Sequence, residues 1–200
     1  MEHDQLVPQI LKRMTVLAAT LMMLDEAKSC VASTRIAIEV LKKFNISARP
    51  LPVRVQAYNA VAQRLLEEGK REQIMTSNTA WSIGLGYDTR KLKHGFPGHL
   101  VSYVIDRYLL DLTIDQLSRP EKHMTLSPLC VDVGADFKSG AVKYTENGDE
   151  VYLFYEYASD LETLFRKGNY WTNLPRRQGS IRRITEALAQ EFQALSVLKN

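Results

Sequence analysis

The spacing of apolar residues changes along the chain, and this change constrains the fold more than any other feature. From about Pro8 to Leu24 the apolar residues recur with helical spacing, at Ile10, Leu11, Met14, Leu17, Ala18, Leu21 and Leu24. A second helix is expected from Cys30 to about Phe44, because Asn45 and Pro50 then stop it. From Leu51 to Ala57 apolar and polar residues alternate, which is typical of a strand.

Further strands are expected in the second half of the chain. Residues 99–105 and 108–114 are predicted to pair around Asp106-Arg107, and 151–157 is predicted to be another strand. A short helix capped by Ser159 or Asp160 and a terminal helix over 180–195, with Ser180 as its N-cap, should follow. Helices first and strands later predict an α+β fold with helices packed on an antiparallel sheet.

The length of 200 residues suits one domain, 1–200, in which residues from about 160 to 200 form a helical elaboration. The 26 basic and 23 acidic residues nearly balance, and a net charge of +3 is too weak to argue for nucleic acid as a partner. The most apolar stretch, Met14 to Leu24, is too short to span a bilayer, so no membrane association is expected.

Two cysteines far apart in the sequence do not form the disulfide framework of a secreted domain, so a reducing, cytoplasmic compartment is predicted. The chain begins MEHDQ, without the basic segment of a signal peptide.

Three residues stand in an order that suits nucleophilic catalysis: Cys30 at a helix start, then His99 and Asp111 on two successive strands. The thiolate is the reactive form of cysteine, and a helix N-terminus and a nearby imidazolium both stabilise it. Asp111 lies between Leu110 and Leu112, and a carboxylate in so apolar a strand needs a partner when it is buried. The structural alternative is that Cys30 is a small core residue and that His99 is a buried histidine whose ring is hydrogen-bonded to a backbone carbonyl.

Two segments, Cys30–Leu41 and Gly98–Gln116, carry a resemblance: the order of Cys, then GH on a strand, then LLDLTIDQ on the next strand resembles the transglutaminase-like branch of the papain-like cysteine superfamily. The resemblance implies a central helix that carries the thiol and packs on an antiparallel sheet bearing the histidine and the aspartate. It also implies that Cys30 is the nucleophile, His99 the base and Asp111 the group that orients the imidazole. No cofactor and no metal are expected.

The chain departs from the papain-like pattern in one respect, because no Gln stands among the residues just before Cys30 to help hold an oxyanion. The backbone N–H of Cys30 is one donor, and Gln56, Trp81 and Asn59 are the candidates for the second.

The register of the predicted hairpin decides which carboxylate meets His99. With a two-residue loop, Asp106-Arg107, His99 falls opposite Ile114, and both Asp111 and Asp115 project from the other face. A three-residue loop, Asp106 to Tyr108, or a bulge returns both carboxylates to the face of His99, with Asp115 directly opposite His99 and Asp111 four positions along the strand. Asp111 remains the first choice because the resemblance points to it, and Asp115 is its rival.

The sequence thus favours a cysteine-dependent hydrolase or acyltransferase that acts on an amide or a thioester through Cys30, His99 and Asp111. The alternative is a catalytically inactive papain-like fold that serves as a protein-interaction module. Two weaker signals remain. Arg176-Arg177 and Arg182-Arg183 form a basic cluster that could meet nucleic acid. A zinc site would have to draw on Cys30, His94, His99, His123 and Cys130, which lack paired short spacings.

Overall fold

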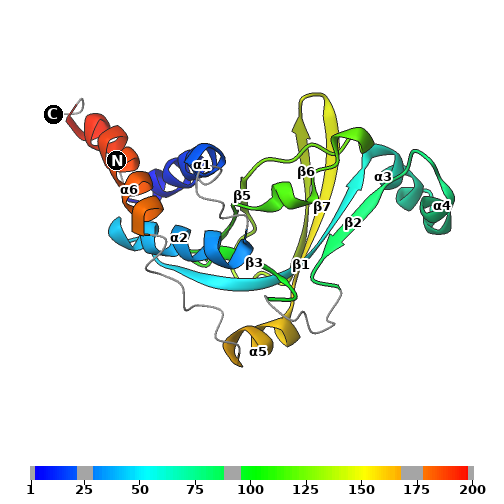
Figure 1. Cartoon of the computed structure of the whole chain (residues 1–200), viewed down its shortest axis with the longest axis horizontal. Helices are drawn as coiled ribbons and strands as arrows, with labels where there is room; N and C mark the ends of the chain where they lie inside the picture. The colour runs from blue at the N-terminus through cyan, green and yellow to red at the C-terminus, as the bar shows by residue number, and fades with distance from the viewer. Residues whose placement is uncertain (1–2, 22–28, 88–95, 168–177, 198–200) are drawn as a thin grey trace.

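The computed structural model describes residues 3–21, 29–87, 96–167 and 178–197. Within these ranges, helices pack on an antiparallel sheet, so the predicted α+β class is confirmed (Figure 1). The α-helices are α1 (His3–Leu21), α2 (Cys30–Lys43), α3 (Ala60–Glu67), α4 (Arg71–Thr76), α5 (Ser159–Lys167) and α6 (Gln178–Val197). Two 3-10 helices are η2 (Ile114–Leu117) and η3 (Pro120–Lys122).

The described residues form a seven-stranded sheet in which every pairing is antiparallel. The strands are β1 (Ala48–Asn59), β2 (Ser82–Leu85), β3 (His99–Val104), β4 (Tyr108–Asp111), β5 (Leu129–Asp132), β6 (Ser139–Glu146) and β7 (Asp149–Tyr157). Their order is β5-β4-β3-β1-β7-β6, with β2 paired to β1 outside this path. Sequence analysis anticipated β1, β3, β4 and β7, but not β2, β5 or β6.

The long strand β1 organises the sheet, because three other strands pair with it. It pairs with β7 along one edge and with β3 and then β2 along the other. The pairing with β3 ends at Val53, and the pairing with β2 begins at Val55. The pairing of β1 with β3 and its pairing with β2 therefore meet beside Arg54.

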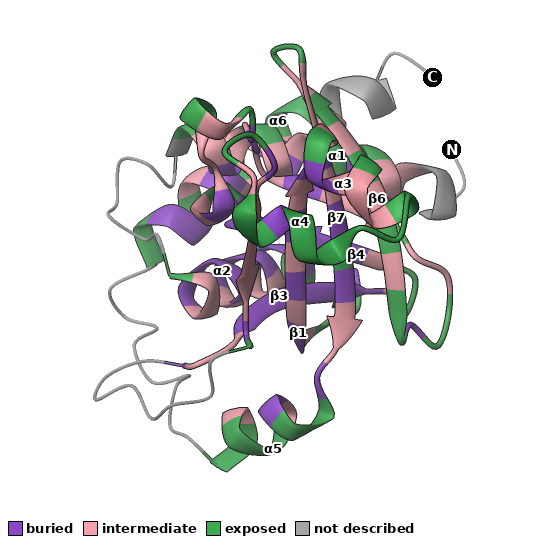
Figure 2. Cartoon of the chain, turned by 90° about the vertical axis from the view of Figure 1, so that its right-hand side faces the viewer, coloured by how far each residue is buried: buried purple, intermediate pink, exposed green. Residues whose placement is uncertain are grey.

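The two faces of the sheet bury different clusters, and the strand β3 between them is buried along its length (Figure 2). One face carries the alternate β1 residues Leu51, Val53, Val55 and Ala57, each at most 3% exposed, which pack with Val101, Tyr103, Leu109 and Tyr155. The other face is covered in part by α1, α2 and α6, whose apolar side chains share a core with Val104 and Leu110. Helix α2 therefore packs on β3 and β1, as a Cys-bearing helix on a sheet was expected to do.

The terminal helix starts earlier than the sequence indicated. Helix α6 already includes Gln178, so Ser180 lies inside the helix, and the prediction that Ser180 is its N-cap is wrong. Ser180 is buried because it shares the inward side of α6 with Ile181, Ile184 and Leu188, which pack into the core formed with α1 and α2.

The turn between β3 and β4 differs from both predicted forms. The pairs are Val104 with Tyr108 and Ser102 with Leu110, so the loop consists of residues 105–107. Ile105 and Asp106 both adopt positive φ, at 46° and 49°, which closes this three-residue loop. If this register is continued by one more pair, Asp111 stands opposite Val101. Val101 is two residues from His99 on β3, so Asp111 and His99 project from the same face of the sheet. Neither predicted register is right, and the strand ends at Asp111 instead of continuing to Ile114.

Candidate functional site

The first turn of α2 holds Cys30 against the start of β3. The Thr34 hydroxyl donates to the carbonyl of Leu100 at 2.9 Å, and the Ser102 hydroxyl donates to the carbonyl of Thr34 at 3.5 Å. These bonds join α2 to β3 one turn beyond Cys30. The thiol then lies 3.8 Å from the carbonyl oxygen of Gly98, the residue before His99.

His99 and Asp111 form a buried pair. His99 Nε2 and Asp111 Oδ2 are 2.7 Å apart, and the side chains are 1% and 0% exposed. The backbone N–H of Thr113 donates to the other carboxylate oxygen, Oδ1, at 3.1 Å. The Tyr155 hydroxyl donates to Oδ2 at 3.0 Å. Donors therefore reach both oxygens of this buried carboxylate and fix its orientation.

The remaining nitrogen of the His99 ring faces the thiol. Nδ1 is buried and makes no hydrogen bond of standard geometry to the described residues. Because Nε2 is occupied by Asp111, the ring atom left for Cys30 is Nδ1. Burial alone would lower the pKa of His99, but the charge of Asp111, its hydrogen bond and the interaction with the Cys30 thiol outweigh this and raise the pKa to about 10. The imidazole is therefore a cation at neutral pH.

The structure thus brings Cys30, His99 and Asp111 together in the expected order, with the imidazole between the thiol and the carboxylate. A protonated imidazole beside a thiol stabilises the thiolate and holds a proton ready for a leaving group. Cys130 differs sharply: it lies on β5 against the helical core, and burial followed by the charge of Asp132 raises its pKa to about 12.

The rival carboxylate does not reach this site. Asp115 is exposed and lies in η2, beyond the end of β4. The register that favoured it assumed the three-residue loop Asp106 to Tyr108 instead of the 105–107 loop observed. The carboxylate that meets His99 is Asp111.

The three candidates for a second oxyanion donor have different positions. The Asn59 side chain is fully hydrogen-bonded: it accepts from Ala62 and Trp81 and donates to Thr79 and Lys122. The backbone of Trp81, bonded to Asn59, lies six residues along β1 from the partner of His99, which is about 20 Å. Its ring packs in the cluster on the His99 face, and its buried Nε1 has no hydrogen-bond partner among the described residues. Asn59 therefore has no donor to spare, whereas Trp81 has its indole N–H.

Gln56 lies three residues along β1 from Val53, the strand partner of His99. Pro52 pairs with Leu100, and Cys30 packs in the cluster that contains Leu100. Because side chains alternate along a strand, Gln56 projects from the same face as Pro52, whereas His99, which pairs with Val53, projects from the other face. No hydrogen bond engages its side-chain amide among the described residues.

An apolar wall adjoins the thiol. Cys30 and Val31 pack with Phe96, Leu100, Leu161 and Phe165, and the two phenylalanine rings meet edge to face with centroids 5.5 Å apart. Gly98 is needed here, because a Cβ at this position would lie 2.7 Å from Leu161 Cδ1 and 2.9 Å from the Phe96 ring.

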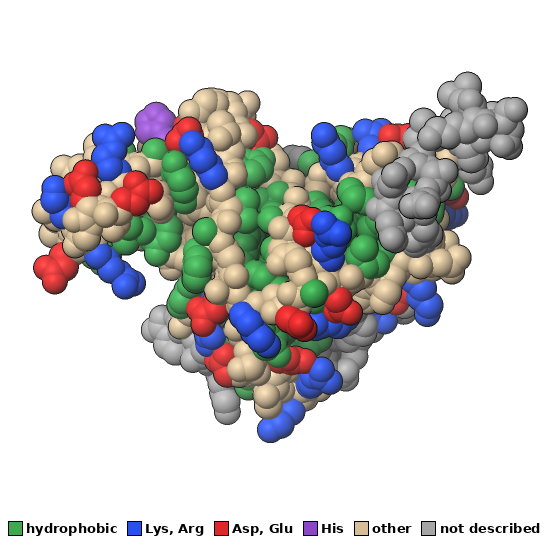
Figure 3. Space-filling view, turned by 180° about the vertical axis from the view of Figure 1, so that it is seen from behind, with side chains coloured by type: hydrophobic (Ala, Val, Ile, Leu, Met, Phe, Trp, Pro, Cys, Tyr) green, Lys and Arg blue, Asp and Glu red, His purple; other side chains and the backbone are tan. Residues whose placement is uncertain are grey.

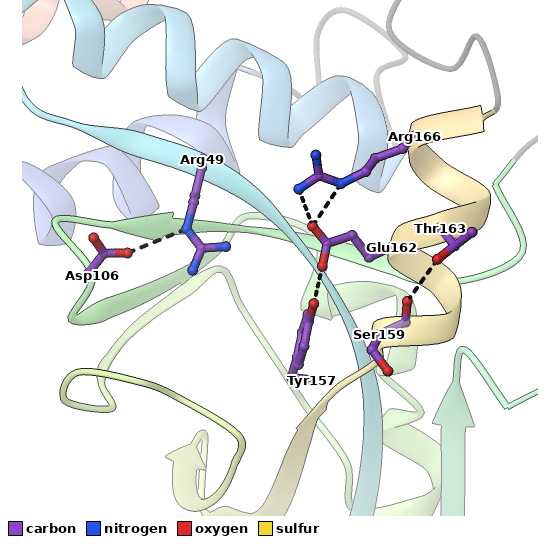
Figure 4. A network of polar contacts seen from close by, with 7 residues as sticks. All are labelled: Arg49, Asp106, Tyr157, Ser159, Glu162, Thr163 and Arg166. Carbon is purple, nitrogen blue, oxygen red and sulfur yellow. Dashed lines mark hydrogen bonds and ion pairs between the residues drawn. The ribbon is translucent and has the colours of Figure 1, made fainter.

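Polar contacts fix the position of α5, which carries Leu161 and Phe165. Figure 4 shows the Tyr157 hydroxyl, at the end of β7, donating to Glu162, which also pairs with Arg166. Arg54 of β1 pairs with Asp160 at 2.5 Å, which joins the start of α5 to the sheet beside Gly98. The wall next to the thiol is therefore attached to β1 and β7.

The other histidines and the arginine cluster noted in the sequence do not come together in a second site among the described residues. His94 lies outside the described residues, and His123 is on the surface beside Asp149. In the part of the chain that the structure describes, no group of three or more His, Cys, Asp and Glu side chains could hold a metal ion. Arg176 and Arg177 also lie outside the described residues, and Figure 3 shows acidic and basic side chains intermixed over the face that it presents.

Comparison of the chain with protein-family models, with curated proteins and with solved structures found no match. Among the helices of the described ranges, none combines the length and apolarity needed to cross a membrane. The argument for a function therefore depends on the geometry around Cys30.

Sequence analysis missed two residues that hold Asp111. Thr113 acts through its backbone N–H, which has no signature in the sequence. Tyr155 sits in the aromatic run 152–157 of a predicted strand, where nothing in the sequence distinguishes it from a packing residue. Its contact with a residue 44 positions earlier depends on the order of the strands, which the sequence alone did not provide.

Proposed function

We propose that this protein is a cysteine-dependent hydrolase or acyltransferase of the transglutaminase-like type, with Cys30 as nucleophile, His99 as acid and base, and Asp111 as the residue that orients the imidazole. The observation that carries the proposal is the buried His99–Asp111 pair at 2.7 Å, whose free ring nitrogen is left for the thiol. The substrate is an amide or a thioester.

The reaction proceeds in two halves. The Cys30 thiolate attacks the carbonyl carbon, forming an S–C bond and moving an electron pair onto the carbonyl oxygen. When that pair returns, the bond to the leaving nitrogen or sulfur breaks, and the leaving group takes the proton from His99 Nδ1. Neutral His99 then removes a proton from water or an amine as this second nucleophile attacks the thioester, and the thiolate departs next to the reprotonated imidazole.

The oxyanion formed in each half needs donors in front of α2. The backbone N–H of Cys30 belongs to the first turn of the helix, whose N–H groups have no partner within the helix. The Gln56 side chain is assigned as the second donor on the basis of its unengaged amide, with the Trp81 indole N–H as its rival. A glutamine on a strand after the cysteine would replace the one missing before it.

The interaction-module alternative now has less support. It arose from the missing upstream glutamine and from a register that turned Asp111 away from His99. The observed register removes the second reason. The apolar packing of Cys30 still favours the alternative, because inert cysteines are commonly found in such surroundings.

The proposal is tested by acylating the protein and identifying the modified residue. The wild type, Cys30→Ala and Cys130→Ser are incubated with the acetyl thioester of N-acetylcysteamine and with acetyl-p-nitroanilide, and intact mass and released product are followed. We expect an acetyl group on Cys30 and product release in the wild type and Cys130→Ser only. Equal product release by Cys30→Ala, or no adduct on Cys30 with either probe, would contradict the proposal.

A further inference from the structure

A tyrosine from a distant strand meets the carboxylate of the candidate site. Tyr155 lies on β7 and Asp111 on β4, and the order of the sheet sets β3 and β1 between these strands. Three strand spacings amount to about 14 Å in a flat sheet. The 3.0 Å contact between the Tyr155 hydroxyl and Asp111 Oδ2 therefore requires the sheet to curve, so that this face becomes concave.

The chemistry of Tyr155 permits one role at this position. Burial, the charge of Asp111 and the hydrogen bond to it together raise the pKa of Tyr155 well above its ordinary value. The phenol therefore stays protonated and acts as a donor. It donates to Oδ2, the oxygen that also meets His99 Nε2, while Thr113 holds Oδ1.

We infer that Tyr155 is a positioning residue: its hydroxyl holds Asp111 Oδ2 at His99 Nε2 and so turns His99 Nδ1 toward Cys30. Without the hydroxyl, the Thr113 N–H still holds Oδ1, but Oδ2 loses its second donor and the carboxylate gains freedom to rotate about its Cβ–Cγ bond. The imidazole then loses its fixed orientation at the thiol. This inference rests on the proposed function only for its effect on turnover.

A purely structural tyrosine would fill the core and satisfy its own hydroxyl, with no effect on His99. Tyr103 offers a matched control for that role. It lies in the same buried cluster and is 2% exposed, and its hydroxyl donates to the backbone carbonyl of Gly134 at 2.9 Å. Tyr155→Phe and Tyr103→Phe each remove one buried hydroxyl and leave the ring.

The test compares these two variants in a Cys130→Ser background. The rate of Cys30 alkylation by iodoacetamide at pH 7 is measured, with the ring-nitrogen NMR signals of His99. We expect Tyr155→Phe to slow alkylation about tenfold and to shift the Nε2 signal, while Tyr103→Phe changes neither. Equal alkylation rates and equal His99 signals in the two variants would overturn the inference.

A second measurement keeps the test decisive if Tyr155→Phe does not fold. 3-Fluorotyrosine is incorporated in the wild type, and the fluorine signals of residues 155 and 103 are followed with pH. The signal of residue 155 should move with the titration of the His99 ring, and that of residue 103 should not. A signal at 155 that ignores this titration would contradict the inference. Neither measurement uses a substrate, so failure of the acylation test would leave the positioning result standing.

Discussion

Asp111 meets His99 across two neighbouring strands although the two residues are not a directly opposed pair. Their side chains share a face because a three-residue loop joins Val104 to Tyr108, and Nε2 and Oδ2 come within 2.7 Å. The same register buries both side chains. A buried ion pair of this kind stabilises the fold only while both partners are charged, and this makes its contribution measurable.

Replacing Asp111 by Asn should lower the pKa of His99 from about 10 toward its ordinary range, because the neighbouring negative charge is removed while burial remains. The variant should also lose about 3 kcal/mol of unfolding free energy, since the buried ion pair and its charge-assisted hydrogen bond are broken. Histidine NMR and urea denaturation check the two effects. Asp115→Asn is the control, because Asp115 is exposed and should change neither; an equal effect from both variants would contradict the assignment.

The unfolding free energy should fall with rising pH across the alkaline range. The pKa of His99 is about 10 in the folded protein and about 6.5 in the unfolded chain. Its contribution is therefore complete below pH 6.5 and is lost as pH rises through 10. Urea denaturation at several pH values should show this decline in the wild type and a flatter profile in His99→Gln. Parallel profiles from pH 6.5 to 9 would be inconsistent with the raised pKa.

Gly98→Ala should destabilise the protein by about 1–3 kcal/mol, because the added methyl group overpacks the wall beside the thiol. Its Cβ would lie 2.7 Å from Leu161 and 2.9 Å from Phe96. Gly179→Ala is the matched control, since nothing lies within 4 Å of a Cβ there and the residue is in α6. Thermal unfolding should show a loss for the first variant and none for the second. Unchanged stability in Gly98→Ala would mean that α5 is not closely packed at this point.

Gln56→Ala should reduce kcat on the order of 100-fold with little change in KM, as expected for the loss of one oxyanion donor. The measurement is steady-state release of product from the thioester probe. Gln63→Ala is the control, because Gln63 is on the exposed side of α3 and bonds only Glu67. A wild-type kcat in Gln56→Ala would show that another group is the second oxyanion donor.

The parts of the fold with a clear periodicity could be predicted from the sequence. The apolar face of α2 and the alternation of β1 were sufficient to predict those two elements. Cys30, His99 and Asp111 were found because each lies in a segment with a clear periodicity, and the order of the three residues along the chain could be recognised. The short strands β2 and β5 could not be found, because four residues carry too little alternation.

The hairpin register is a different kind of failure. Its loop depends on positive φ at Ile105 and Asp106, and a β-branched residue such as Ile rarely adopts that conformation, so turn rules pointed to another loop. Tyr155 was missed because its partnership with Asp111 arises from strand order and curvature, which are not properties of any single segment.

The central claim, that His99 activates the Cys30 thiol, is tested most directly by the rate of Cys30 alkylation against pH, in Cys130→Ser and in Cys130→Ser with His99→Ala. An ordinary thiol ionises near pH 8.5, so its alkylation rises steeply up to that value. The account predicts faster alkylation at pH 7 when His99 is present, and the ordinary slow rate with the ordinary rise when it is absent. The same ordinary rise in both proteins would show that Cys30 is a structural cysteine and would contradict the account.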